Sequence, residues 1–403
     1  MYRKAHKRPC SKVEGHRPGG ERTSKAVCLM ASGGWPILEL VRQIALSYAF
    51  GRRDAASPIS HPLIDLLQAV QEEGSISGAA RRLGQSYRHT WGELRRWETE
   101  LDRALLVWER GQAARLTEFG QKLMWAERQA QARLAPQIEA LQAGLERVFA
   151  VAFDDTAHIL TLFASHDDAL PLLREQAIVQ AKLHLDVRFC GSVDAIAGLN
   201  AGRCTLAGFH VPPTPTSGTL AQRTYQPLLQ PGQHKIIGFA RRRQGLAVAP
   251  GNPLRLQSFA DLARNKARYV NRAVGAGTRV LAEQLLAEAG LRQEHVSGWN
   301  REEPSHAAVV QAVLSGDADA GLVIEAAARR LALDFVPLLE EDYYLVCLKS
   351  ALDEPPIAAL RDLLQQPAWN MQLAQLPGYA PRRSGEVLSL HRELPWWRFP
   401  KDR

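Results

Sequence analysis

The chain has 403 residues, a length typical of two or three domains, and 46% of them are hydrophobic, which is enough for more than one core. Its net charge of +8 is unevenly distributed, because the first 30 residues hold eight Lys and Arg against two Glu and so supply +6 of it. In the rest of the chain, positive and negative charges are nearly equal in number. This argues against a protein that binds nucleic acid over most of its surface and favours one local basic site.

The cysteines and the hydrophobic runs exclude several other classes of protein. The spacing of the five cysteines matches neither a zinc site nor a disulfide framework, so we expect no metal, no cofactor and a reducing compartment. No apolar run approaches the roughly 18 residues of a membrane-spanning helix. The basic N-terminus also lacks a secretory core. We therefore expect a cytoplasmic protein that does not contact a membrane.

Residues 1–57 form a basic N-terminal extension that we expect to be disordered. The residues before Met30 would not belong to the working protein if translation started there. Within the extension, residues 36–50 have apolar side chains at helical spacing and predict one helix, either packed on the next domain or poorly ordered.

Residues 74–98, GSISGAARRLGQSYRHTWGELRRWE, predict two short helices joined by a tight turn at Gly84. Ser75 and Ser86 are suited to cap the two helices, and a further helix over residues 61–73 precedes them. The second helix is rich in Arg and in hydrogen-bonding side chains. In a helix-turn-helix, this second helix would lie in a DNA major groove. An ordinary amphipathic helix pair with solvated arginines would show the same sequence pattern.

A β-hairpin is predicted directly after this helix. Residues 105–108 and 113–116 fit its two strands and residues 110–112 its turn, after which Thr117 caps a long helix. A hairpin at this position is typical of the wing of a winged helix. Its basic residues Arg110 and Arg115 would lie along the phosphates.

Residues 61–130 resemble the winged helix-turn-helix of LysR-type and molybdate-responsive bacterial regulators. The resemblance rests on GSISGAARRLGQSYRHTW and on the end of the wing, RLTEFGQKL. We therefore predict a DNA-binding domain over residues 58–116 with double-stranded operator DNA as its partner. The predicted DNA-binding residues are Ser75, Ser86, Tyr87, Arg88, His89, Arg95, Arg110 and Arg115.

Residues 117–150 predict one long linker helix with an apolar seam, and Pro136 inside it predicts a kink or break. A helix between a DNA-reading head and the next domain would suit dimerisation, since winged-helix proteins usually read two half-sites. We expect a homodimer or homotetramer. The alternative is a helix that packs only within its own subunit.

From residue 157 to residue 380 the pattern alternates between strands and helices, which predicts a largely parallel, helix-covered sheet. The predicted strands are residues 158–163, 185–190, 206–211, 235–240, 245–249, 268–271, 296–299, 320–324, 335–338 and 343–348. Ligands of such sheets bind beyond the carboxyl ends of the strands.

Three loops after predicted strands carry candidate effector-binding residues. In the first, Ser165, His166 and Asp167 could bind an anion or simply cap the next helix. In the second, NRAVGAGTR, the glycines allow backbone N–H groups to point inward. Arg279 could bind a carboxylate or oxyanion there through two parallel hydrogen bonds. In the third, Glu303 and His306 could face the cleft or only begin a helix. The full set is Ser165, His166, Asp167, His210, Arg272, Gly275, Gly277, Thr278, Arg279, Glu303 and His306.

These loops carry a second resemblance. Residues 157–380 resemble the type II periplasmic-binding-protein-like domain that some bacterial regulators append to a molybdate-regulator-type winged helix and that also occurs fused to molybdopterin-biosynthesis proteins. The matching stretches include SHDDALPLL, QGLAVAPGNP, YVNRAVGAGTR, EEPSHAAVVQAVLSGDADAGLVIEAAAR and LPGY. The likeness implies two α/β lobes joined by crossover strands near residues 236–241 and 341–348. Ala276 departs from the Gly-Ser-Gly-Thr-Arg of the family, and residues 381–403 form a tail outside the resemblance.

The sequence therefore predicts a multidomain protein with a winged-helix DNA-binding domain, a linker helix and a two-lobed α/β domain of the periplasmic-binding-protein type. No enzyme motif is present, so we predict no catalysis and expect a ligand-responsive transcriptional regulator. The resemblance points to molybdenum or tungsten metabolism, with molybdate, tungstate or a molybdopterin-related species as the small anionic effector. Formate or another small carboxylate, as the signal for a molybdoenzyme such as formate dehydrogenase, is equally compatible with one Arg and a group of backbone N–H donors. The alternative is a cytoplasmic carrier protein of molybdenum-cofactor biosynthesis.

Overall fold

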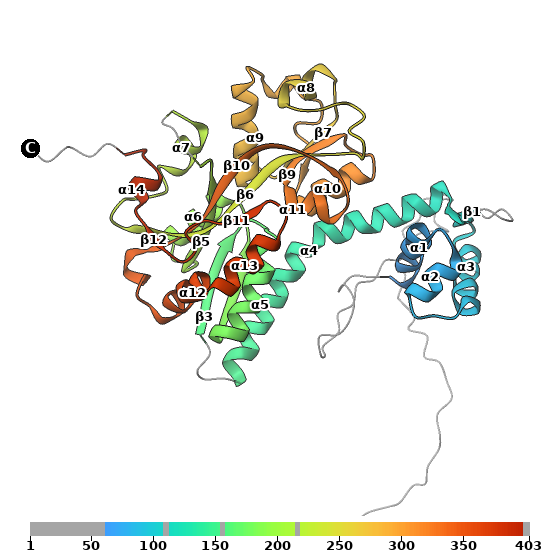
Figure 1. Cartoon of the computed structure of the whole chain (residues 1–403), viewed down its shortest axis with the longest axis horizontal. Coiled ribbons are helices and arrows are strands. Elements are labelled where there is room, and N and C mark those ends of the chain that lie inside the picture. The colour runs from blue at the N-terminus through green and yellow to red at the C-terminus, as the bar shows by residue number, and fades with distance from the viewer. Residues whose placement is uncertain (1–60, 108–112, 154–157, 214–217, 398–403) are drawn as a thin grey trace, which may run out of the picture. The chain divides into compact units, whose positions relative to one another are not determined.

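The computed structural model describes residues 61–107, 113–153, 158–213 and 218–397 (Figure 1). The N-terminal extension with its predicted helix at 36–50 lies outside the described residues, and so does Arg110 in the wing. Within the described ranges, no helix combines the length and the apolar character that a membrane span needs.

The winged helix has the elements that the sequence predicts. They are α1 (Pro62–Glu73), α2 (Ile76–Arg82), α3 (Tyr87–Leu101), β1 (Leu106–Val107) and β2 (Arg115–Leu116). The Ser75 hydroxyl accepts a hydrogen bond from Gly78 N at 3.0 Å, and the Ser86 hydroxyl accepts one from His89 N at 3.2 Å, so both predicted caps are confirmed. Gly84 has a φ of +64°, a conformation that suits glycine and turns the chain between α2 and α3.

The linker helix α4 (Glu118–Phe153) continues through Pro136, so of the predicted kink or break the break is excluded (Figure 1). A proline leaves one helical carbonyl, four residues earlier, without its usual N–H donor. That carbonyl belongs to Ala132, and it accepts a hydrogen bond from the Ser305 hydroxyl at 3.1 Å. A donor from outside the helix thus replaces the one that the proline lacks.

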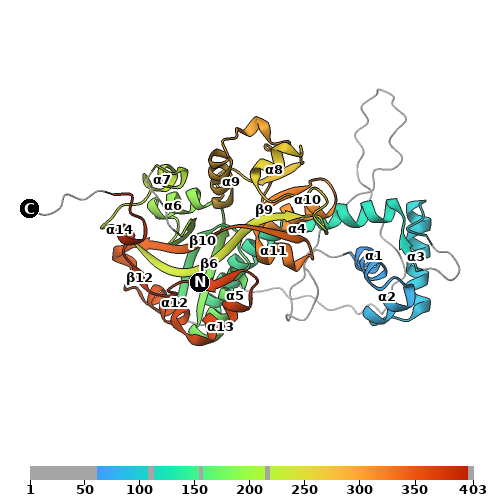
Figure 2. The ribbon, with the colours of Figure 1, turned by 45° about the horizontal axis from the view of Figure 1, so that its top comes forward.

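The α/β part is built on one ten-stranded sheet with the order β4-β3-β5-β10-β6-β9-β7-β8, and β11 and β12 pair with β6. The two long strands β6 (His234–Val248) and β10 (Asp334–Leu348) lie side by side in the middle and run through both lobes (Figure 2). The first lobe contains β3 (His158–Ala164), β4 (Leu183–Phe189) and β5 (Leu206–Val211). The second lobe contains β7 (Tyr269–Arg272), β8 (Glu302–Glu303) and β9 (Ala320–Ile324).

Helices cover the sheet and complete the lobes. The first lobe has α5 (Ala169–Ala181), α6 (Ser192–Asn200) and α7 (Leu220–Tyr225). The second has α8 (Phe259–Arg264), α9 (Gly277–Glu288), η1 (Gln293–His295), α10 (His306–Leu314) and α11 (Glu325–Arg330). The chain ends with η2 (Lys349–Ala351), α12 (Pro355–Gln365), α13 (Pro367–Gln375), β11 (Tyr379–Pro381), β12 (Val387–Leu388) and α14 (Leu390–Glu393).

Three sequence predictions about this sheet are wrong. Residues 235–240 and 245–249 belong to the single strand β6, and residues 335–338 and 343–348 belong to β10. The charged residues between them looked like loops, but they pair across the two strands, with Arg242 opposite Glu341. Both strands are antiparallel to their neighbours, so the sheet is mixed and not largely parallel. Residues 296–299 form no strand, since Val296 and Trp299 are buried in a turn after η1.

The segment expected as a C-terminal tail is partly folded. β12 pairs with β6, and Trp396 is buried in a hydrophobic cluster with residues of α6 and α7. The sequence did not predict this because β12 has two residues and α14 is short. Such short elements show no clear hydrophobic periodicity. Residues 381–397 thus contribute to the core of the first lobe.

Candidate functional site

The predicted recognition helix presents an exposed basic face. Tyr87, Arg88, His89 and Arg95 are exposed on α3, and Arg115 is exposed on β2. Arg95 is held in place, because it pairs with Glu98 at 2.9 Å and lies 4.5 Å from the ring centre of Trp91. Arg88 forms no ion pair with any residue that the structure describes. The geometry leaves these side chains available to a polyanion.

The two lobes meet at glycines. A Cβ atom on Gly191, which follows β4, would lie 2.4 Å from the carbonyl oxygen of Gly275, which follows β7. A Cβ atom on Gly277 would lie 3.1 Å from the Ser192 hydroxyl and 3.2 Å from Nδ1 of His210. Only glycine allows backbones and side chains to approach this closely. The lobes are therefore closed, with the ends of the parallel strands of both lobes facing each other.

Asp167, in the loop after β3, has a structural role in this region. Its carboxylate accepts hydrogen bonds from Tyr379 OH at 2.8 Å and from Ala169 N at 2.8 Å, and it forms an ion pair with Arg242. The hydroxyl of Ser165 caps nothing and has no hydrogen-bond partner among the described residues. Asp167 thus accepts from the first N–H group of α5, whose N-cap residue is Asp168, and the Ser165 hydroxyl stays available to a ligand.

Arg242 is buried at the centre of the cleft and is neutralised. Its Nε donates to Glu341 Oε1 at 2.6 Å, and its Nη1 contacts Asp167. Burial opposes the charged guanidinium, but Glu341 and Asp167 outweigh it and hold the pKa of Arg242 above its ordinary value. With two carboxylates around one guanidinium, Arg242 does not need an external anion.

Arg272, at the end of β7, is in the opposite situation. It is 4% exposed, and its Nη2 donates to the carbonyl oxygen of Pro304 at 2.9 Å. Its Nε and Nη1 have no hydrogen-bond partner among the described residues. Burial, followed by the charge of Arg242, lowers the pKa of Arg272 to about 9. A buried cation without a carboxylate is costly, and an anion bound beside it would remove that cost.

Two neutral histidines lie near Arg272. Burial is the main cause that lowers the pKa of His210 and of His306 well below the ordinary value, and Arg242 and Arg272 lower both further. His210 Nε2 and His306 Nδ1 lack hydrogen-bond partners among the described residues. The hydroxyls of Tyr225 and Tyr343 are likewise buried and unpartnered in the part of the chain that the structure describes. The site therefore offers one unpaired positive charge and several neutral polar groups.

The sequence missed several residues of this site because they lie inside strands and helices and not in loop motifs. They are Ser192, Tyr225, Arg242, Glu341, Tyr343 and Tyr379. The one available signal was the run Arg241-Arg242-Arg243 inside an otherwise apolar segment. Arginines within a buried strand need carboxylates or other acceptors nearby. A run of three therefore indicates a buried group of charged residues.

Other predicted effector-binding residues have partners already. Thr278 accepts a hydrogen bond from Gln244 Nε2 at 3.0 Å, and Gly275 supplies a turn with a φ of +86°. Arg279 donates to Glu283 at 2.9 Å, lies 3.4 Å from Glu302 and is 4.9 Å from the ring centre of Trp299. These contacts give Arg279 a structural role in the second lobe. Of Arg272 at the end of β7 and Arg279 in α9, Arg272 is the one without a carboxylate partner among the described residues.

The linker helix contacts the rim of the site. Glu303 is 1% exposed, and Arg133 of α4 binds its two carboxylate oxygens at 2.8 and 2.7 Å. Glu139 of α4 lies 3.3 Å from His166 Nε2. A cavity of about 240 Å³ lies between α4 and both lobes, and its lining includes Pro136, Ser165, Gly191 and Arg272. The helix that leads to the winged helix is therefore one wall of the candidate effector site.

Comparisons with known proteins agree with this two-part organisation. Residues 63–121 match the family model described as bacterial regulatory helix-turn-helix protein, lysR family, and residues 174–365 match that of the PBP superfamily domain. The uncharacterised protein YvgK of Bacillus subtilis is 30% identical over 221 residues, which are 55% of this chain and 70% of YvgK. The chain belongs to the same family as YvgK, and its two matched parts are those of a LysR-type regulator. Its α/β half is a PBP superfamily domain, and it is a DNA-binding regulator and not an enzyme.

Further relatives of this LysR-type regulator are more distant. A Clostridium pasteurianum protein, described as an uncharacterised protein in the ferredoxin 2Fe-2S gene 5′ region, is 29% identical over 27% of this chain and 98% of its own. CbnR solved with its target DNA is 18% identical, covering 73% of this chain and 94% of CbnR, with a TM-score of 0.35. LysG of Corynebacterium glutamicum with bound effector Arg is 19% identical, covering 75% and 95%, also with a TM-score of 0.35.

Proposed function

We propose that this LysR-type regulator senses a small anion, which binds at Arg272 between the closed lobes and thereby changes operator binding. The observation that carries the proposal is the buried Arg272 guanidinium, two of whose nitrogens have no partner and which has no carboxylate beside it in the described part of the chain. Ser165 lines the same cavity and supplies a hydroxyl, while the neutral His210 and His306 are buried near Arg272. Since the lobes close over the site, an anion that binds both lobes would favour the closed state.

The size and charge of the site support a small anion as the effector. A cavity of about 240 Å³ beside one guanidinium suits molybdate, tungstate, formate or another small carboxylate. The phosphate group of a molybdopterin-related species would satisfy the same nitrogens, with the rest of the molecule in the mouth of the cleft. We place this sensing in molybdoenzyme metabolism on the resemblance stated for the sequence.

A thermal-shift panel with molybdate, tungstate, formate, sulfate and phosphate tests the effector. At a hundredfold its dissociation constant, the true effector adds about 2.7 kcal/mol to the free energy of unfolding. The affinity of the protein for the anion should stay constant near neutral pH, because His210 and His306 remain neutral there. It should then fall about tenfold per pH unit above about pH 9, as Arg272 loses its proton. Stabilisation by none of the five anions, or stabilisation that persists far above that pH, would contradict the proposal.

For operator binding, we propose that Arg88 contacts DNA from the recognition helix. Replacing Arg88 with alanine should weaken binding of a DNA fragment selected by the wild-type protein by about 1–3 kcal/mol, or roughly 5- to 150-fold. The matched control is Arg292→Ala, which removes an exposed arginine of the second lobe. Equal affinities of all three proteins, measured by fluorescence anisotropy at physiological salt, would refute this role. Absence of salt-dependent DNA binding by the wild type would instead favour the carrier function.

We propose that α4 also forms the interface with a second copy of the chain. Leu141, Leu145 and Val148 are 66%, 45% and 57% exposed on α4, at positions i, i+4 and i+7 of one helix face. Leu145→Glu should convert the dimer to a monomer in sedimentation experiments, because it buries a charge in the interface. Gln121→Glu, at an exposed position of the same helix, should leave the mass unchanged. A wild-type monomer, or a Leu145→Glu dimer, would rule out this interface.

A further inference from the structure

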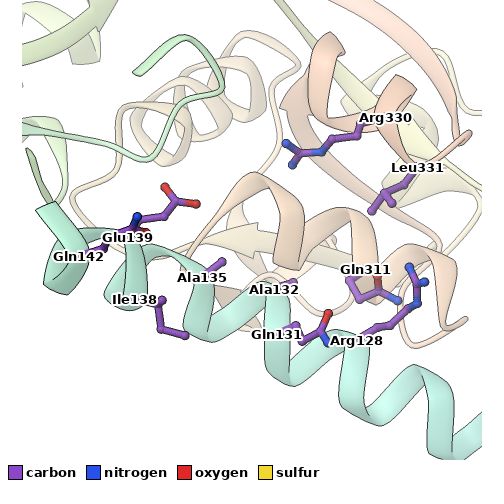
Figure 3. Close-up of a pocket in the computed structure, with 10 residues that line it drawn as sticks. All are labelled: Arg128, Gln131, Ala132, Ala135, Ile138, Glu139, Gln142, Gln311, Arg330 and Leu331. Atoms are coloured by element: carbon purple, nitrogen blue, oxygen red, sulfur yellow. The ribbon is translucent and has the colours of Figure 1, made fainter. Parts of the chain in front are cut away.

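A second, larger cavity lies on another part of the linker helix. It has a volume of about 460 Å³ and is open to solvent. Its lining comes from α4 on one side and from α10, α11 and Leu331 on the other (Figure 3). It shares no lining residue with the cavity at Arg272. The two cavities are therefore separate candidate sites.

The lining of this cavity has a built polar side. Gln311 of α10 is 2% exposed, and its Nε2 has no hydrogen-bond partner among the described residues. Arg128 and Arg330 line the same space, and Arg330 is held by Asp168, whose Oδ1 lies 3.2 Å from Arg330 Nη1. Glu139 is the one carboxylate in the lining, and it lies 3.3 Å from His166 Nε2. Two guanidinium groups and an unused amide N–H favour an anionic ligand group.

The rest of the lining is apolar. Ala132, Ala135 and Ile138 of α4 lie along one wall, and Leu331 lies opposite them (Figure 3). A free inorganic oxyanion would leave these side chains uncovered in a space nearly twice as large as that at Arg272. The lining instead matches a molecule with a hydrocarbon or aromatic body and one acidic group.

We propose that this cavity is a second ligand site, which binds an organic acid with an apolar body. The carboxylate accepts from Gln311 Nε2 and pairs with a guanidinium of the lining, and the body packs on Ile138, Ala135 and Leu331. Such a ligand touches α4 and the second lobe at once, so it stabilises the packing of the linker helix on that lobe. The proposal concerns binding alone and does not depend on the effector of the Arg272 site.

The test measures binding of acetate, hexanoate and benzoate to the full chain by calorimetry at constant ionic strength. The three probes share one charge and differ in apolar body, so hexanoate and benzoate should bind at least about tenfold more tightly than acetate. Equal affinities of the three probes would overturn the proposal, because the apolar wall would then contribute nothing.

Variants locate the binding site. Ile138→Asp places a negative charge in the wall, and Gln311→Leu removes the amide donor, so each should weaken hexanoate binding at least about tenfold. Arg272→Met should leave hexanoate binding unchanged while abolishing the response to the small anion. Loss of hexanoate binding in Arg272→Met alone would assign it to the site between the lobes and refute a second site. Because Ile138 is only partly buried, its variant tests the site even if Gln311→Leu fails to fold.

Discussion

Replacement of Arg272 by methionine should raise the free energy of unfolding of the ligand-free protein by about 1–3 kcal/mol and abolish its stabilisation by the anion. The free energy of unfolding should rise because methionine fills a similar volume and removes a buried charge that has no carboxylate partner among the described residues. The anion response is lost because, among the described residues of the site, Arg272 is the cation without a carboxylate partner. Urea unfolding with and without the anion measures both effects.

Arg279→Met is the matched control, because Arg279 lies in the same loop region and is almost as buried but is paired with Glu283 and Glu302. This variant should lower the free energy of unfolding by about 1–3 kcal/mol, since it leaves partly exposed carboxylates without a partner. If Arg272→Met destabilises the ligand-free protein as much as Arg279→Met does, Arg272 is a structural residue and the anion site lies elsewhere.

Replacement of Arg242 by methionine should have the largest effect on folding, a loss of about 3–5 kcal/mol in the free energy of unfolding. Asp167 is 0% exposed and Glu341 is 2% exposed, and the variant leaves both carboxylates buried beside an apolar side chain. The same measurement detects the change as a lower urea midpoint with an unchanged slope.

A triple variant separates the charge effect from the packing effect. Combining Arg242→Met with Asp167→Asn and Glu341→Gln removes the unpaired charges, so it should recover more than half of the stability that Arg242→Met loses. If the triple variant is as unstable as the single one, the arginine acts through its packing on the Tyr343 ring, which lies 5.4 Å away, and not through its ion pairs.

The organisation of the chain could be predicted because local signals carry it. Ser75, Gly84 and Ser86 mark the helix-turn-helix through caps and a turn, which need only a few neighbouring residues. The crossover strands could be predicted only in fragments, because the charges in their middle are neutralised by residues about a hundred positions away. The hydrogen bond between Arg242 and Glu341, for example, spans 99 residues. These ion pairs depend on the register between β6 and β10, which cannot be read from the sequence.

The choice between Arg272 and Arg279 shows the same limit for the site. Both arginines belong to the stretch YVNRAVGAGTR and either could bind an anion. Glu283 lies four residues after Arg279, a helical spacing that already indicates an intrahelical ion pair. The absence of a carboxylate beside Arg272 is visible only when β7, β8 and the first lobe are assembled.

Pro136 has a mechanical consequence for the protein. A proline inside an isolated helix costs about 3 kcal/mol, largely through the lost hydrogen bond and the clash with the preceding turn. Here the Ser305 hydroxyl, 173 residues further along the chain, supplies the lost bond to Ala132. The hydrogen bonding of α4 beside Pro136 is thus completed by the second lobe. If that lobe moved away from α4, the Ala132 carbonyl would lose its donor, and the helix would bend most easily at this point.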